Sequence, residues 1–116
     1  MNDFQELIVW QKSMALAKEV YAYTRKLPSE ERFGLCSQMQ RCGISIPSNI
    51  AEGSKRGTRK DFSQFLRIAS GSAAELETQF ELAAHIYGHS PVKAQPIFKR
   101  SSENVRSIHK ETLNLL

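Results

Sequence analysis

The sequence contains little of what several classes of protein need. Its 116 residues include only two Cys, six Gly and four Pro, which is too few for a disulfide scaffold or for a turn-rich β-sandwich of this length. No apolar run approaches the ~20 residues that a membrane-spanning helix needs. The first residues also lack the basic segment that opens a secretory signal. We therefore expect a cytoplasmic protein with free thiols and no association with a membrane.

The composition is that of a folded domain. Hydrophobic residues make up 41% of the chain and charged residues 24%, which is ordinary for a globular protein and excludes a disordered tail. A chain of this length forms one domain, so we expect residues 1–116 to fold as a unit. Sixteen basic residues against twelve acidic ones give a net charge of +4, a mild preference for polyanionic partners.

Apolar side chains recur at helical spacing over almost the whole chain. The pattern predicts helices at about residues 5–27, 30–53, 59–87 and 94–115. Short links between helices of this length make sequence neighbours antiparallel. The expected fold is therefore all-α, an up-down-up-down antiparallel four-helix bundle.

Each predicted helix carries one stripe of side chains that we expect in the core. In the first helix the stripe is Leu7, Trp10, Met14, Ala17, Tyr21 and Thr24. In the third it is Phe62, Phe65, Leu66, Ala69, Ala73, Leu76, Phe80, Ala83 and Tyr87. In the fourth, which is the weakest, it is Ile97, Ser101, Val105, Ile108, Thr112 and Leu115.

The second helix contains a proline. Pro47 lacks a backbone N–H and its ring meets the carbonyl of Gly43, so we expect one helix that bends between these residues. Antiparallel pairing with the third helix predicts Cys42 near Ala69. Asn49 lies at or beside a core position of this helix, where a polar side chain needs a partner and commonly fixes helix register.

Chemistry-bearing residues are sparse. Cys36 and Cys42 lie on different faces of one predicted helix, so they can neither pair nor share a zinc ion. Glu81, His85 and His89 share a helical face, but they lack a fourth ligand, and a solvated face explains them better. No nucleophile with a base and no glycine-rich phosphate loop is present. We therefore expect no enzymatic activity, no cofactor and no bound metal.

A basic cluster gives the best functional signal from the residues alone. Lys55, Arg56, Arg59 and Lys60 fall within six residues around Gly57, and Arg67 extends the cluster along the third helix. Such a loop can hold phosphates by charge without reading sequence, and the start of the next helix adds backbone donors. A merely solvated loop is the alternative. No aromatic residue interrupts the four loop charges, so base stacking is not predicted.

Several segments resemble one known family. They are Phe4–Lys12, Leu27–Leu35, Ser45–Gly53 and Phe65–Glu77. The third segment, with the motif Ser-Ile-Pro-x-Asn-Ile-Ala-Glu-Gly, is long and specific. Together they resemble the four-helix bundle proteins encoded in intervening sequences of bacterial 23S rRNA genes, also called the S23 ribosomal protein family. The similarity covers roughly residues 4–88, and it places Pro47, Asn49, Glu52 and Gly53 in the family's structural motif.

The resemblance implies an antiparallel bundle, a ring-shaped homo-pentamer and no established catalysis. Related pentameric bundles carry basic surfaces for nucleic acid, so by analogy the five basic residues become candidate contacts to RNA or DNA. The alternative is a protein-interaction scaffold that captures an unidentified protein through Glu77 and Glu81 or through the last helix. The chain departs from the family in Ile108–Leu113, which is more polar than the apolar run expected there.

Overall fold

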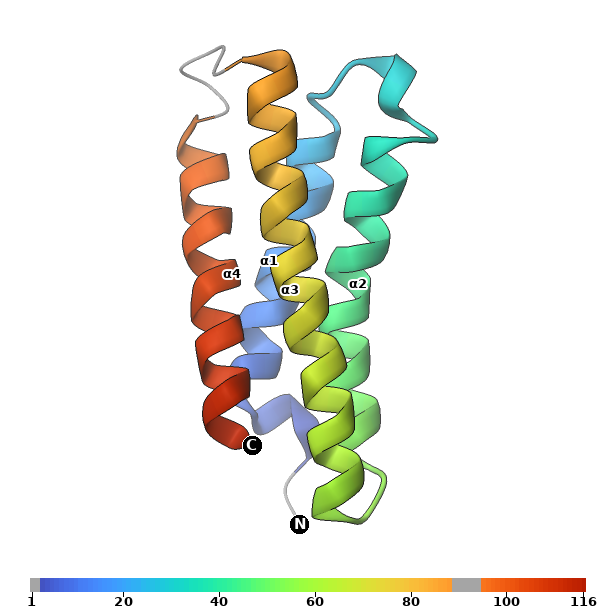
Figure 1. Cartoon of the computed structure of the whole chain (residues 1–116), viewed down its shortest axis with the longest axis vertical. Coiled ribbons are helices and arrows are strands. Elements are labelled where there is room, and N and C mark those ends of the chain that lie inside the picture. The colour runs from blue at the N-terminus through green and yellow to red at the C-terminus, as the bar shows by residue number, and fades with distance from the viewer. Residues whose placement is uncertain (1–2, 89–94) are drawn as a thin grey trace.

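A computed structural model describes residues 3–88 and 95–116, with side chains from residue 103 onward in the second range. These residues form four α-helices and two short 3-10 helices (Figure 1). In chain order they are η1 Phe4–Glu6, α1 Ile8–Thr24, η2 Ser29–Glu31, α2 Leu35–Ser54, α3 Arg59–Tyr87 and α4 Gln95–Leu115. Each helix packs on the next in sequence, and α4 packs back on α1. The predicted all-α four-helix bundle is confirmed.

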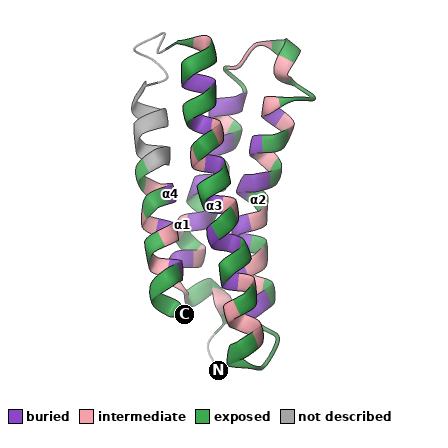
Figure 2. Cartoon of the chain, viewed as in Figure 1, coloured by how far each residue is buried: buried purple, intermediate pink, exposed green. Residues whose placement is uncertain are grey.

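The core is continuous along the bundle, with buried positions facing inward from every helix (Figure 2). In α3 the predicted stripe is confirmed, because Leu66, Ala69, Ala73, Leu76 and Phe80 are fully buried. The predicted bounds of α3 also hold. Thr58 caps the helix by accepting a hydrogen bond from the Asp61 amide at 3.1 Å.

The predicted core stripe of α1 is wrong in its middle turns, although Thr24 is buried as predicted. Met14 and Tyr21 are 37% and 38% exposed, whereas Leu16 and Val20 are fully buried. The helix carries two apolar stripes, each with the spacing of three or four residues that a helical turn gives. Because both stripes have this spacing, periodicity alone does not show which of them faces the core. The second stripe therefore remains as apolar surface on the outside of α1.

The second helix begins later than predicted. Residues 29–31 form η2 instead of its first turn, and α2 begins at Leu35. Glu31 supplies the cap, because its Oε1 accepts from the Leu35 amide at 3.1 Å. Tyr87, at the far end of α3, donates its hydroxyl to the other carboxylate oxygen of Glu31. These two hydrogen bonds lower the pKa of Glu31, and the bond to the carboxylate raises the pKa of Tyr87 to about 12.

Pro47 lies inside a single continuous helix, as predicted, and its side chain is buried. The bend expected there remains a prediction. Gly43, four residues earlier, lies against α1, where an added Cβ would meet Val20 Cγ2 at 3.4 Å. This is an ordinary van der Waals distance, so the packing of α1 on α2 does not itself require glycine at this position.

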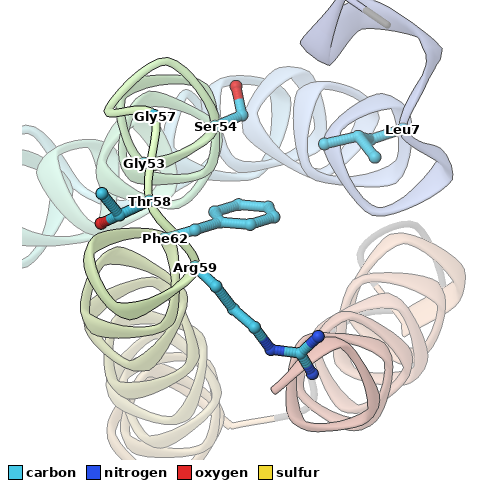
Figure 3. A pocket seen from close by; sticks show the side chains of 7 residues that line it. All are labelled: Leu7, Gly53, Ser54, Gly57, Thr58, Arg59 and Phe62. Atoms are coloured by element: carbon cyan, nitrogen blue, oxygen red, sulfur yellow. The ribbon is translucent and has the colours of Figure 1, made fainter. Parts of the chain in front are cut away.

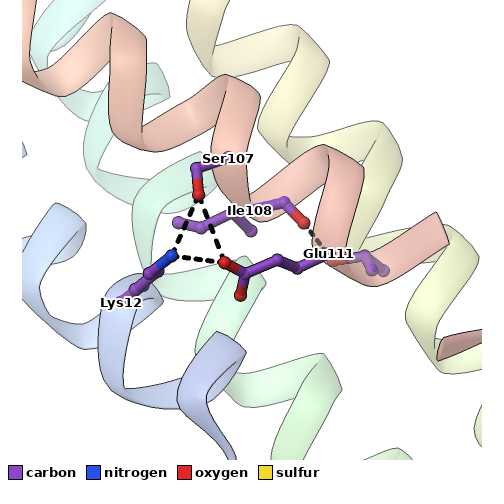
Figure 4. Close-up of polar contacts among 5 residues, drawn as sticks. Lys12, Ser107, Ile108 and Glu111 are labelled. Atoms are coloured by element: carbon purple, nitrogen blue, oxygen red, sulfur yellow. Dashed lines mark hydrogen bonds and ion pairs between the residues drawn. The ribbon is translucent and has the colours of Figure 1, made fainter. Parts of the chain in front are cut away.

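Polar contacts hold much of α4 in place. Lys12 donates to Ser107 at 3.1 Å and pairs with Glu111 (Figure 4). Arg106 donates to Glu77 at 2.7 Å. Three side chains of the predicted stripe, Val105, Ile108 and Thr112, are fully buried.

One expectation for α4 is wrong, because Leu115 is 41% exposed at the end of the helix. His109 is half-buried, and its Nδ1 lies 2.6 Å from Ser70 Oγ on α3. The predicted core positions Ile97 and Ser101 lie outside the described side chains.

Candidate nucleic-acid interface

The link between α2 and α3 brings the predicted basic residues to one end of the bundle (Figure 1). Gly57 has a φ of 91°, a left-handed conformation that favours glycine. It lets the chain reverse between the end of α2 at Ser54 and the Thr58 cap of α3. Lys55, Arg56, Arg59 and Lys60 are all exposed around this turn. We call these four residues the basic loop.

Two members of the basic loop already have acidic partners. Lys55 Nζ lies 3.7 Å from Asp3 Oδ1, and Arg56 donates to Glu52 Oε2 at 2.8 Å. The two cations and their two acidic partners are all at least half exposed. Each ion pair therefore contributes little to stability, and the cations can readily exchange these partners for others. The Arg56 guanidinium also lies over a ring, 5.0 Å from the centre of Phe65.

The other cations make no ion pair with the described side chains, although Asp61 follows Lys60 in the first turn of α3. Arg59, Lys60 and Arg67 are exposed and make no ion pair with any residue that the structure describes. Lys60 and Arg67 are seven residues apart on α3, so they lie on the same face of the helix. Three cations without an ion pair among the described residues therefore lie on the first three turns of α3.

The family motif in α2 makes structural contacts beside the basic loop. Asn49 donates to the Ser45 carbonyl at 2.8 Å and to Ser45 Oγ at 2.9 Å. Ser45 Oγ in turn lies 3.0 Å from Ser72 Oγ on α3. At Gly53 an added Cβ would fall 2.5 Å from Phe65 Cβ, so only glycine fits at this approach of the two helices.

These contacts correct the predicted register of α2 and α3. Ser72 lies opposite Ser45. Cys42 lies beside Glu75 and Gln79 instead of Ala69. The observed pairing of α2 with α3 is thus shifted by about six residues from the predicted pairing. The prediction used the length of the link between the helices, whereas the close approach at Gly53 sets the register.

A cavity of about 440 Å³ opens next to the basic loop. Leu7 closes it on one side and Phe62 on the other, and Arg59 extends across its edge toward α4 (Figure 3). The remaining lining residues come from the end of α2 and the turn, namely Gly53, Ser54, Gly57 and Thr58. Sequence reasoning missed this cavity, because its two apolar walls are more than fifty residues apart in the chain. The only available signal was an aromatic residue three positions after Arg59.

The structure also places the residues considered for metal or thiol chemistry. Cys36 and Cys42 are buried free thiols. Burial, and then the neighbouring charge of Glu75, raise the pKa of Cys42 to about 11. Within residues 3–88 and 95–116, no group of three or more His, Cys, Asp or Glu side chains is arranged to hold a metal ion. His89 of the predicted Glu81–His85–His89 set lies outside the described residues.

None of the described helices is both long and apolar enough to cross a membrane.

Comparisons with known proteins give one family. The profile of the 23S rRNA-intervening sequence proteins matches residues 5–110. A crystal structure of a protein of unknown function from the S23 ribosomal protein family of Bacteroides thetaiotaomicron is similar, with a TM-score of 0.78 and 26% identity. The match covers 93% of this chain and 97% of that one. No curated protein matches the sequence. The chain belongs to the 23S rRNA-intervening sequence protein family.

Proposed function

We propose that the protein is a non-catalytic bundle that binds RNA or other nucleic acid through phosphate contacts. Lys55, Arg56, Arg59, Lys60 and Arg67 make these contacts. The observation that carries the proposal is the group of exposed cations on the first turns of α3 that lack acidic partners. Uncompensated Lys and Arg charges favour binding of a polyanion, since each phosphate contact releases a condensed counterion.

The start of α3 adds backbone donors to this surface. In its first intrahelical hydrogen bond the Phe62 amide donates to the Thr58 carbonyl at 3.0 Å. Thr58 Oγ1 accepts a hydrogen bond from the Asp61 amide. The amides of Arg59 and Lys60 precede these bonds, at the positive end of the helix dipole. A phosphate held by the Arg59 and Lys60 side chains therefore also meets two N–H groups.

The alternative role as a protein scaffold has weaker support on the acidic face of α3. Glu77 already accepts from Arg106 at 2.7 Å and is half-buried, which leaves Glu81 as an exposed acid. Charge reversal at Glu77 would therefore disturb α4 as well as any partner.

Salt-dependent RNA binding tests the proposed function. The probe is a fluorescent 20-nucleotide RNA, and its affinity is measured by anisotropy from low to high salt. Replacing the four basic-loop residues by Gln removes four charges, so the slope of log affinity against log salt becomes shallower by about three. The matched control replaces four exposed cations elsewhere, Lys18, Arg25, Arg41 and Lys110. Equal losses in both variants, or binding that ignores salt, would contradict the proposal.

We also propose that the chain forms a homo-pentameric ring, as the family resemblance implies. The second apolar stripe of α1 supports self-assembly, because Met14 and Tyr21 lie on the outer surface and Ile44 of the adjacent α2 is 47% exposed. A ring would present the basic loop several times and increase avidity. Light scattering should give a mass near five times 13.1 kDa, and Met14→Lys with Tyr21→Lys should lower it. A monomeric wild type would contradict the proposal.

A further inference from the structure

We propose that the cavity beside the basic loop binds one unpaired nucleobase, so that the protein prefers single-stranded nucleic acid over a duplex. This inference rests on the proposed function, because the phosphates next to that base are held by the basic loop. It also revises the sequence-based expectation that base stacking plays no part.

The cavity has the size and lining of a site for a flat apolar ring. Its volume of about 440 Å³ falls within the range of small-molecule sites. Leu7 and the half-buried ring of Phe62 form opposite apolar walls (Figure 3). Gly57 adds no side chain, and a Cβ placed there would meet nothing within 4 Å, so this part of the rim is open.

Two hydroxyl-bearing residues, Ser54 and Thr58, also belong to the cavity lining. Thr58 Oγ1 accepts from the Asp61 amide and Ser54 Oγ donates to the Ala51 carbonyl at 2.8 Å, and neither hydroxyl is aimed at the ring of Phe62 (Figure 3). The inference therefore rests on the aromatic face of Phe62, on which a base of any sequence can stack.

The surrounding charge selects an anionic occupant. Arg59 lies at the cavity edge without an acidic partner among the described residues, and Lys60 follows it. A nucleotide joins an apolar ring to a phosphate across one sugar, which matches a cavity bordered by cations. A duplex keeps its bases paired and stacked, so it reaches the charges but cannot fill the cavity.

Three probes separate base binding from phosphate binding. They are a 20-nucleotide single-stranded oligodeoxynucleotide, the same strand in a duplex, and a strand of equal length with abasic sites throughout. We expect the single strand to bind at least fivefold more tightly than the abasic strand at equal salt. Phe62→Leu keeps the wall apolar but removes the aromatic face, so it should weaken single-strand binding about 5- to 100-fold. Duplex and abasic affinities should remain unchanged.

Phe33→Leu is the matched control, because Phe33 is 87% exposed at the opposite end of the bundle. It should alter no affinity. Leu7→Ser serves as a second cavity variant if Phe62→Leu does not fold, since Leu7 is the N-cap of α1, where Ser is favoured. Equal affinity for all three probes would overturn the base site while leaving the proposed function intact. Failure of every probe to bind at low salt would overturn both.

Discussion

At the end of the bundle where α2 passes into α3, exposed cations lie beside an open cavity, and Arg59 lines it. At the opposite end, α1 passes into α2 through a segment that contains both bases and acids, namely Arg25, Lys26, Glu30, Glu31 and Arg32. There the Glu31 carboxylate caps α2 and is bonded by Tyr87, which ties the end of α3 to the start of α2.

The two ends show how differently a loop can use its charges. At the Glu31 end, two acids lie among three bases, and the Glu31 carboxylate accepts from the first amide of α2. At the basic loop, the close helix approach needs only glycine and aromatic contacts, so Arg59 and Lys60 remain available for a ligand. Exposed charge without an ion pair in the described part of the chain, placed beside a cavity, is where we propose that the ligand binds.

The largest predicted effect on stability lies under the basic loop, at Gly53. Gly53→Ala places a Cβ 2.5 Å from Phe65 Cβ and 3.1 Å from Phe62 Cδ1, so the helices must separate. We expect a loss of about 1–3 kcal/mol in the free energy of unfolding, measured by urea denaturation. The control is Gly71→Ala, where an added Cβ meets nothing within 4 Å. It should stabilise the protein by about 0.5–1 kcal/mol, and equal effects of both changes would contradict the account.

The Glu31 end should be sensitive to acid. Hydrogen bonds from Tyr87 and Leu35 lower the pKa of Glu31, so this contribution is present above the unfolded pKa and is lost as pH falls through the folded value. Tyr87→Phe removes the larger of the two causes. We therefore expect its Tm to fall below that of wild type near neutral pH and the two values to converge toward pH 3. A constant difference in Tm across this range would contradict the assignment.

The smallest predicted effect concerns the cations of the basic loop themselves. Arg56→Gln removes an ion pair to Glu52 in which both side chains are at least half exposed. We expect a cost between zero and about 1 kcal/mol, which disappears at high salt. Urea denaturation at low and high salt checks this. A loss of several kcal/mol would show that the loop charges serve folding, and the contrast between the two ends would disappear.

The family motif and the helix count were predictable from local signals. The bounds of α3 follow from the Thr58 cap and from Gly88, whose φ of 70° ends the helix. The start of α2 was not predictable, because its cap is fixed by Tyr87, 56 residues from Glu31. The core stripe of α1 was ambiguous, since two apolar stripes share one helix.

The candidate site was also predictable only in part from the sequence. The basic loop is contiguous in sequence, so its composition showed it directly. The absence of acidic partners around Arg59 and Lys60, and the aromatic rings of Phe62 and Phe65 beside the loop, arise only when α2 and α3 pack. Leu7 completes the cavity from the other end of the chain.

Hydrogen exchange followed by mass spectrometry, with and without a single-stranded RNA at low salt, tests the central claim most directly. The account predicts slower exchange in residues 53–62 and unchanged exchange in residues 25–34, at the other end of the bundle. Protection of residues 25–34, or RNA binding that leaves residues 53–62 unprotected, would contradict it.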